Sequence, residues 1–203
     1  MTDPVHVPGG RRVVGSLDAP DADAAVVACP PHPQQGGSRS DPRLRAVGDA
    51  LGPDLACLRI DYGPWDEGRG ERIDAENALA WAADRYDAVG LFGYSFGAAV
   101  ALRAAASLAD GPVAPRACSV LAPPAGLTGQ RDAAEAVDAV PCPLQVVYGD
   151  RDEAVAWGPV VERARDRGAV VESVAAGHGF AGHAGTVADL IAPFFRLHLV
   201  PER

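Results

Sequence analysis

Residues 93–97 read Gly-Tyr-Ser-Phe-Gly and carry the clearest chemical signal in the sequence. A serine in the pattern G-x-S-x-G is typical of a nucleophile elbow, a turn so tight that side chains do not fit at the flanking positions. An apolar run at 88–92 precedes this turn and an alanine-rich segment at 97–108 follows it. Because strand, turn and helix stand in the order that the motif requires, we expect Ser95 to present its hydroxyl at the carboxyl end of a sheet.

Two other interpretations of this turn are a phosphate-binding loop and a purely structural turn. Phosphate loops have the patterns GxGxxG or GxxxxGKS/T, and the segment GLFGYSFG at 90–97 matches neither. The chain also contains no lysine. The residues therefore favour a catalytic serine, with a structural turn as the alternative.

A catalytic serine needs partners, because its hydroxyl is a weak nucleophile near neutral pH. A histidine must accept its proton, and a carboxylate usually orients that histidine. After this kind of elbow the chain order is serine, acid, histidine. Asp150 and Asp152 follow the next-to-last predicted strand, and His178 and His183 follow the last one. Both kinds of partner thus occur in the expected order and on strand-end loops.

Strand-like and helix-like segments alternate along the chain. Apolar runs predict an edge hairpin and six further strands, of which the last five or six read as continuously apolar: 5–7 and 12–17, then 24–29, 55–60, 88–92, 117–122, 144–148 and 169–174. Spacing and end signals predict five helices: 42–52, 71–85, 97–108, 157–167 and 186–198. In the second helix Ile73, Asn77 and Trp81 share one face.

This alternation predicts an α/β fold, with a mainly parallel central sheet of about seven strands flanked by helices. A length of 203 residues and a hydrophobic content of 48% suit a single domain over 1–203. Ligands in such folds sit at the carboxyl ends of the strands. The loops that carry the serine, the aspartates and the histidines all lie there.

The charge balance argues against a nucleic-acid partner. There are 27 acidic and 18 basic residues, all of the latter arginine, for a net charge of −9, which repels phosphates. No apolar run approaches the length needed to cross a bilayer, and the first residues form no signal segment, which predicts a cytoplasmic protein that binds no membrane. The excess of aspartate is typical of a salt-adapted protein and, equally, of an ordinary acidic protein from a GC-rich genome.

The four cysteines are Cys29, Cys57, Cys118 and Cys142. They form no CxxC pair and no cluster with histidine at metal-ligand spacing. The first three fall in predicted strands, where a free cysteine behaves as a small buried hydrophobic residue. We therefore predict no metal, no cofactor and no disulfide.

Three segments together resemble the α/β-hydrolase superfamily: GYSFG at 93–97, GDRDEAV at 149–155 and AGHGF at 176–180. In particular the chain is similar to the small, lidless, dienelactone-hydrolase-like esterases of that superfamily. CPPHPQQGG at 29–37 and RIDYGPWDEGRGE at 59–71 are similar to two further loops of that branch. The likeness covers most of the chain and implies the α/β-hydrolase fold with little or no cap domain.

The resemblance also implies roles for single residues. It makes Ser95 the nucleophile, Asp152 the orienting acid and His178 the general base. Asp150 remains the alternative acid, since it lies nearer the strand end, although an aspartate there is also a common turn residue. His183 remains the alternative base, although its position before a helix is typical of an exposed or capping residue.

Two N–H groups must stabilise the oxyanion of the reaction. In this fold one is the backbone N–H of Phe96, directly after the nucleophile. The other comes from the loop after the strand at 24–29, where Pro30 and Pro31 have no N–H to donate. His32 is the first available donor and matches the family position, with Gln34 as the next choice.

The pocket for the substrate is expected to include Tyr94, Gln34, Tyr62 and Trp65. Alternatively, Trp65 covers the core and does not line the pocket. Segment 123–142 is the place for a cap, and at its length it forms one short helix at most. The site is therefore expected to be open and to admit small substrates.

These features predict a serine hydrolase that acts on a small-molecule ester, lactone or thioester without a cofactor. A thioesterase or a peptidase could use the same three residues. A dienelactone hydrolase proper carries cysteine at position 95, so the serine argues against that activity. Outside enzymes, the alternative is an inactive α/β-hydrolase scaffold that binds a ligand or a partner.

Overall fold

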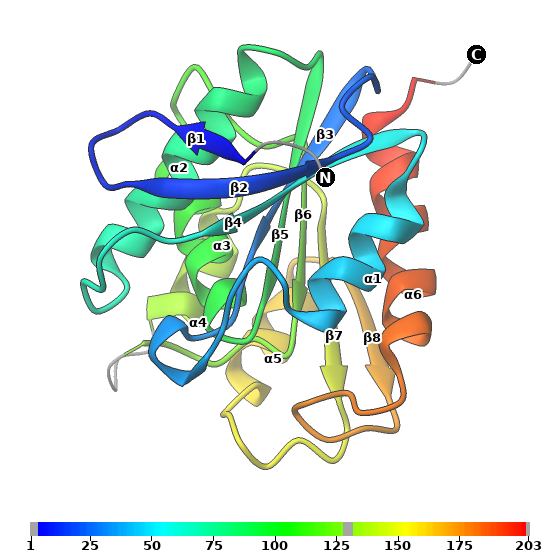
Figure 1. The fold of residues 1–203 in the computed structure, drawn as a ribbon. Helices are drawn as coiled ribbons and strands as arrows, with labels where there is room; N and C mark the ends of the chain where they lie inside the picture. The colour runs from blue at the N-terminus through cyan, green and yellow to red at the C-terminus, as the bar shows by residue number, and fades with distance from the viewer. Residues whose placement is uncertain (1–3, 128–131, 202–203) are drawn as a thin grey trace.

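The computed structural model describes residues 4–127 and 132–201, which form an eight-stranded sheet with helices on both faces (Figure 1). The strand order is β1-β2-β4-β3-β5-β6-β7-β8. The bounds are β1 Val5–Val7, β2 Val13–Asp18, β3 Ala24–Cys29, β4 Leu55–Asp61, β5 Ala88–Tyr94, β6 Ala117–Leu121, β7 Leu144–Gly149 and β8 Val170–Val174. β2 pairs antiparallel with β1 and β4, and all the other pairs are parallel. The predicted mainly parallel sheet is confirmed, with the edge hairpin as part of it.

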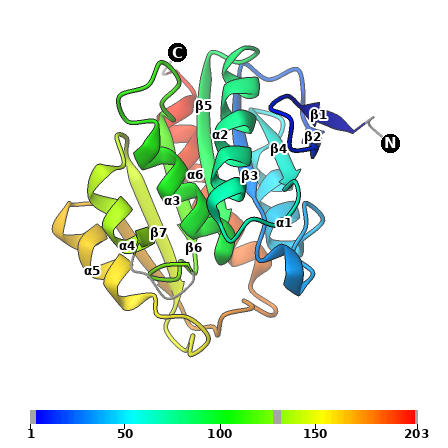
Figure 2. The same cartoon turned by 90° about the vertical axis from the view of Figure 1, so that its left-hand side faces the viewer.

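Helices cover the sheet in two layers, which Figure 2 shows from the side. The bounds are α1 Pro42–Leu51, α2 Arg69–Ala83, α3 Phe96–Ser107, α4 Asp132–Ala136, α5 Gly158–Asp166 and α6 Ala184–Leu199, with single 3₁₀ turns η1 Pro33–Gln35 and η2 Val137–Ala139. Side chains of α1 and α6 fill the core on one face of the sheet, and those of α2, α3, α4 and α5 fill the core on the other.

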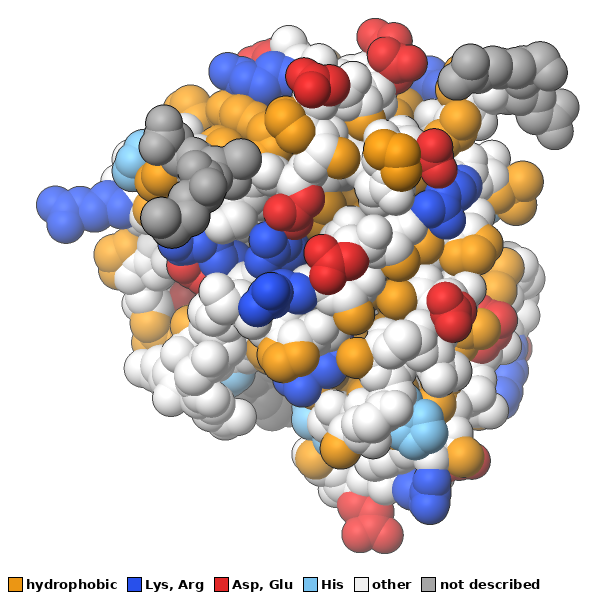
Figure 3. All heavy atoms as spheres, turned by 45° about the vertical axis from the view of Figure 1, so that its right-hand side comes forward, with side chains coloured by type: hydrophobic (Ala, Val, Ile, Leu, Met, Phe, Trp, Pro, Cys, Tyr) orange, Lys and Arg blue, Asp and Glu red, His pale blue; other side chains and the backbone are white. Residues whose placement is uncertain are grey.

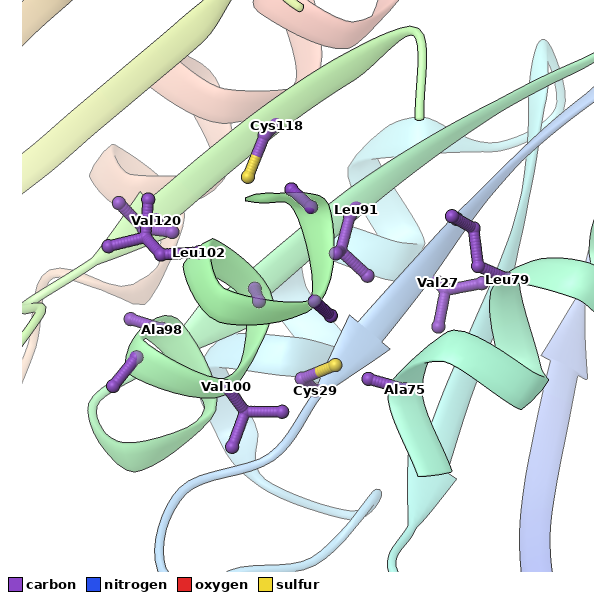
Figure 4. Close-up of a cluster of buried hydrophobic side chains, with 14 of the residues drawn as sticks. Val27, Cys29, Ala75, Leu79, Leu91, Ala98, Val100, Leu102, Cys118 and Val120 are labelled. Atoms are coloured by element: carbon purple, nitrogen blue, oxygen red, sulfur yellow. The ribbon is translucent and has the colours of Figure 1, made fainter. Parts of the chain in front are cut away.

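The alanine-rich helix α3 packs over β3, β5 and β6 in the middle of the larger core (Figure 4). Its alanines allow the helix to approach the sheet closely, and Val100 and Leu102 fill the remaining space. Cys29 and Cys118 belong to the same core and are free and buried, as expected. Burial raises the pKa of the Cys29 thiol to about 12, so this thiol stays protonated and unreactive.

The face of α2 that Ile73, Asn77 and Trp81 share is not its buried face. Ile73 is 39% exposed, and Asn77 and Trp81 are only half-buried. The buried face instead carries Leu79 and six small or acidic residues: Gly70, Glu71, Asp74, Ala75, Ala78 and Ala82. Small residues let α2 lie close to the sheet, so the large side chains are displaced to the outer face.

The two buried acids of α2 hold the loop between β4 and α2. Glu71 accepts hydrogen bonds from the backbone N–H groups of Asp66 and Gly68, both at 2.8 Å. Asp74 accepts one from the N–H of Gly63 at 2.9 Å. Since buried carboxylates need such partners, these contacts explain why acidic residues occupy a core face.

The last strand also differs from the prediction. β8 pairs only with β7 at the edge of the sheet, and Val170 is 46% exposed. Of its five residues only Val174 is buried. The expectation of a continuously buried run is wrong here, because an edge strand has a sheet neighbour on one side only.

The predicted cap segment, 123–142, holds the short helix α4 and the turn η2. Residues 128–131 of this segment lie outside the described residues. In the parts of the chain that the structure describes, the only regular structure of the segment is thus this short helix and the turn that follows it. The expectation of a short helix at most holds for the described part.

Figure 3 shows acidic and basic side chains interspersed over one face of the molecule, with histidine side chains toward its lower end. That end corresponds to the carboxyl ends of the parallel strands in Figure 1. Among residues 4–127 and 132–201, no helix has both the length and the apolar character needed to cross a membrane.

Candidate active site

Ser95 lies at the sharp turn between β5 and α3. Its backbone has φ 55° and ψ −120°, which a residue with a side chain rarely adopts. The N–H of Ser95 donates to the carbonyl of Leu121 at 2.8 Å, and the carbonyl of Ser95 accepts from the N–H of Ala98 at 2.8 Å. The strained conformation is thus held from both sides, as in a nucleophile elbow.

The two glycines of the elbow are required by close backbone contacts. A Cβ on Gly93 would lie 2.1 Å from the carbonyl oxygen of Gly97. A Cβ on Gly97 would lie 2.2 Å from the carbonyl oxygen of Cys29 and 2.4 Å from that of Pro30. All three distances are far below van der Waals contact. Those at Gly97 show that the turn packs directly against the loop that follows β3.

A chain of hydrogen bonds joins the serine to a histidine and a carboxylate. Ser95 Oγ lies 2.8 Å from His178 Nε2, and His178 Nδ1 lies 2.8 Å from Asp152 Oδ2. The Asp152 side chain is fully buried, whereas that of His178 is 25% exposed. The loops that follow β5, β7 and β8 therefore bring the three predicted residues together.

The two alternatives from the sequence lie outside this chain of hydrogen bonds. The side chain of Asp150 is 50% exposed, and its ion-pair partner is Arg151 at 3.8 Å. His183 is the residue directly before α6. The geometry therefore favours Asp152 and His178, and the roles of these residues remain predictions.

Hydrogen bonds around Asp152 orient its carboxylate and hold its loop. Oδ1 accepts a hydrogen bond from the N–H of Ala154 at 2.9 Å, which leaves Oδ2 for His178. The indole N–H of Trp157 donates to the carbonyl of Asp152 at 3.0 Å and holds the loop. A carboxylate at Nδ1 selects the tautomer with its proton on that nitrogen. Nε2 is then free to accept the proton of Ser95.

The predicted oxyanion donors lie on either side of the contact at Gly97. Phe96 is the first residue of α3, so its N–H has no acceptor within the helix and lies at the positive end of the helix dipole. The carbonyl of His32 accepts from the N–H groups of Gln35 and Gly37, both at 3.0 Å, which fixes the conformation of the loop after β3. Phe96 and His32 therefore remain the predicted donors.

The larger of two cavities beside Ser95 and His178 has a volume of about 460 Å³. We call it the larger cavity; besides these two residues, its wall includes His32, Gln35, Trp65, Phe96, Leu127 and Val155. The His32 ring lies 4.6 Å from that of Trp65 and 5.0 Å from that of Phe96, between ring centroids. Aromatic and aliphatic side chains make this cavity suitable for an apolar group.

The smaller cavity has a volume of about 270 Å³ and also reaches Ser95 and His178. Its wall includes His32, Gln35, Gly37, Asp41, Arg43 and Tyr94. The sequence analysis did not single out Asp41 and Arg43, because the segment Ser40-Asp41-Pro42 indicates only the start of a helix. Asp41 does cap α1, through a hydrogen bond from the N–H of Arg43 at 2.9 Å.

Two of the predicted pocket residues do not line either cavity. The side chain of Gln34 is exposed, and its neighbour Gln35 takes the place on the wall. The ring of Tyr62 packs edge-on against Phe96, at 5.8 Å between centroids, and its hydroxyl donates to the carbonyl of Pro30 at 3.1 Å. Tyr62 thus supports the wall from behind.

Tyr94 is nearly buried and holds the histidine loop. Its hydroxyl donates to the carbonyl of His178 at 3.0 Å, and its ring stacks on the imidazole at 5.7 Å between centroids. Burial raises the pKa of the Tyr94 phenol, so the hydroxyl keeps the proton that it donates. The guanidinium of Arg43 lies over the same ring, 4.6 Å from its centroid. Tyr94 is therefore a positioning residue for His178.

Replacement of Gly97 by alanine tests the close contact at the elbow. We expect Gly97→Ala to lower the free energy of unfolding by about 1 to 3 kcal/mol, because the new methyl group overlaps two carbonyl oxygens. Gly158→Ala is the matched control, since nothing lies within 4 Å of the added Cβ. Urea unfolding measures both variants, and an equal midpoint for the two would contradict the contact.

Removal of one hydroxyl tests the role of Tyr94. We expect Tyr94→Phe to lower kcat for ester hydrolysis about 3- to 10-fold with little change in KM, because one hydrogen bond that orients His178 is lost. Tyr86→Phe is the control, since Tyr86 is also buried and donates to a carbonyl, that of Pro20, at 3.3 Å. If Tyr94→Phe and Tyr86→Phe both lower kcat in proportion to their loss of free energy of unfolding, Tyr94 has no special role in orienting His178.

Solved structures similar to this chain are α/β hydrolases and esterases. A lidless α/β serine hydrolase from Xanthomonas campestris is 24% identical, with a TM-score of 0.80 over 99% of this chain and 96% of that chain. Est1E from Butyrivibrio proteoclasticus is 17% identical, with a TM-score of 0.82 over 98% of this chain and 100% of that chain. A dienelactone hydrolase from Anabaena variabilis is 23% identical, with a TM-score of 0.76 over 97% of each chain.

No protein-family model and no curated protein sequence matches the chain. Structural likeness at identities of 17% to 24% establishes the fold and leaves the activity to the residues of the site. TM-scores of 0.76 to 0.82 over nearly the whole of each chain show that the folds agree. The expected resemblance is confirmed at the level of the fold: the chain has the α/β-hydrolase fold of the lidless serine hydrolases and esterases.

Proposed function

We propose that this protein is a serine hydrolase that cleaves small esters or ester-like substrates through an acyl-enzyme. The observation that carries the proposal is the continuous chain of hydrogen bonds from Ser95 through His178 to the buried Asp152. A structural turn needs neither the strained serine nor a histidine at 2.8 Å from its hydroxyl. This arrangement is the one that activates a serine.

In the first half of the reaction Ser95 Oγ attacks the carbonyl carbon of the substrate. Its proton passes to His178 Nε2, and Asp152 stabilises the imidazolium that forms. The carbonyl oxygen becomes an oxyanion, and we expect the N–H groups of Phe96 and His32 to stabilise it. Collapse of this intermediate breaks the bond to the leaving alcohol or thiol, which takes the proton from His178.

In the second half a water molecule replaces the leaving group. His178 Nε2 accepts a proton from this water as it attacks the acyl carbon. The second oxyanion occupies the same position as the first. When the bond to Ser95 Oγ breaks, the serine recovers its proton from His178 and the acid is released. Besides the substrate and this water, the proposed reaction uses only groups of the chain.

The shape of the site favours small substrates. The wall of the larger cavity includes Pro124, Gly126 and Leu127 from segment 123–142. The regular structure in the described part of that segment is the short helix α4 and the turn η2. The cavity volume of about 460 Å³ suits a group of modest size. Among the similar structures are esterases, and one structure of Est1E holds ferulic acid, which supports an ester as the substrate class for this chain.

Removal of the serine hydroxyl tests the nucleophile. We expect Ser95→Ala to lower kcat for p-nitrophenyl esters at least about a thousandfold and to abolish labelling by a fluorophosphonate probe. Ser173→Ala, at an exposed position of β8, is the control and should retain both. A folded wild-type protein that neither hydrolyses these esters nor takes up the probe would instead favour an inactive binding scaffold.

Two aspartates on one loop offer a matched pair of variants for the acid. We expect Asp152→Asn to lower kcat about 10³- to 10⁴-fold, because an amide at this position stabilises the wrong imidazole tautomer. Asp150→Asn should leave kcat within about twofold, since surface substitutions of this kind have small effects. Steady-state hydrolysis of p-nitrophenyl acetate measures both, and the opposite ranking would assign the role to Asp150.

A further inference from the structure

The two cavities meet at the reacting groups. The larger and the smaller cavity share Ser95 and His178, and both also reach His32 and Gln35. A substrate whose carbonyl carbon lies at Ser95 Oγ can therefore extend one arm into each cavity. The larger cavity is walled by aromatic and aliphatic side chains, whereas the smaller one is walled by polar groups at the start of α1 and on the loop after β3.

Polar side chains form much of the wall of the smaller cavity. Within the described part of the chain, two buried side-chain atoms have no hydrogen-bond partner, His32 Nδ1 and Arg43 Nε. Both residues belong to the wall of the smaller cavity. Because both atoms are buried, they lie within the wall and do not face the cavity. The polar side chains that a ligand in the smaller cavity can meet include those of Gln35, Asp41 and Arg43.

The charges on this wall point to a neutral ligand. Arg43 Nη2 donates to Asp41 Oδ2 at 2.6 Å, so the one guanidinium and the one carboxylate of the wall form an ion pair. The buried carboxylate of Asp152 lies directly behind His178 and adds a negative charge. An anionic ligand would approach two carboxylates, and a cationic one would approach the guanidinium.

Hydroxyl groups suit this wall because each can both accept and donate a hydrogen bond. A hydroxyl oxygen accepts from a guanidinium N–H, and a hydroxyl proton is donated to a carboxylate or an amide oxygen. Arg43, Asp41 and Gln35 provide these donors and acceptors around one cavity of about 270 Å³. That volume holds a short chain with two or three hydroxyl-bearing carbons rather than a long lipid.

On the basis of the proposed hydrolase function, we propose that the smaller cavity binds a neutral, hydroxyl-bearing arm of the substrate. The natural substrate is then an ester that joins an apolar group, held in the larger cavity, to a short polyol or a short hydroxy acid. Asp41 and Arg43 are the residues that determine this specificity. The reacting atoms and the steps of the reaction are those given above.

A comparison of matched esters tests the proposal on the wild-type protein. Glycerol monobutyrate is compared with propyl butyrate, and methyl glycerate with methyl butyrate. We expect kcat/KM to be about tenfold higher for the hydroxylated ester in at least one of the pairs, the size expected for one or two hydrogen bonds. The first pair reports a hydroxylated alcohol and the second a hydroxylated acid.

Variants on α1 test which residues are responsible. In Arg43→Met, the ratio of kcat/KM between hydroxylated and plain ester should fall toward one. Arg45→Met is the control, because Arg45 is exposed on the same helix, and it should keep the wild-type ratio. Gln35→Leu, at an exposed position of the cavity wall, provides a second test that does not disturb the helix. Its ratio should fall at least about twofold.

The outcomes separate this proposal from the proposed function. If the wild type hydrolyses the plain esters in a Ser95-dependent manner but prefers the hydroxylated ester in neither pair, the polar subsite is overturned and the hydrolase stands. An undiminished ratio in both Arg43→Met and Gln35→Leu would overturn it as well. If neither ester of either pair is hydrolysed and the fluorophosphonate probe does not react, the hydrolase function itself fails.

Discussion

The site depends on a close contact between two backbone segments, the turn after β5 and the loop after β3. No side chain fits between them. Gly97 lies against the carbonyl oxygens of Cys29 and Pro30, and a Cβ there would come within 2.2 Å of the first. This contact brings the start of α3, with the free N–H of Phe96, next to the loop that holds His32. Because the contact involves main chain only, the nucleophile and the predicted oxyanion donors keep one relative position before any substrate binds.

The parallel sheet extends this arrangement to the other predicted catalytic groups. β7 and β8 are neighbours, so the loops that follow them, with Asp152 and His178, lie side by side at the lower end of the molecule in Figure 1. The N–H of Arg151 donates to the carbonyl of Ala176 at 3.1 Å and links the two loops directly. Strand ends and main-chain contacts thus position the acid and the base, while Tyr94 orients the histidine from the strand that carries the nucleophile.

Apolar runs in the sequence predicted the strands well where a strand is buried along its whole length. The run at 24–29 is continuously apolar, and β3 occupies those residues because it lies between two parallel neighbours. The pattern was less informative on α2, where Ile73 and Trp81 share one face and small residues such as Ala75 form the buried face. Buried acids cannot be recognised by apolar spacing, since Glu71 is buried only because the N–H groups that it accepts from come from a loop that folds back on it.

By itself the sequence predicted the nucleophile and the order of acid and base, and it determined the alternation that produces a parallel sheet, because tight turns and apolar runs depend on neighbouring residues. Only the tertiary structure decided between Asp150 and Asp152, which differ in whether the loop directs the carboxylate into the core or into solvent. The same holds for Arg43, whose contact with Tyr94 joins segments far apart in the chain. Such contacts arise from the packing of α1 and β5 on one sheet, and no local pattern of residues records that packing.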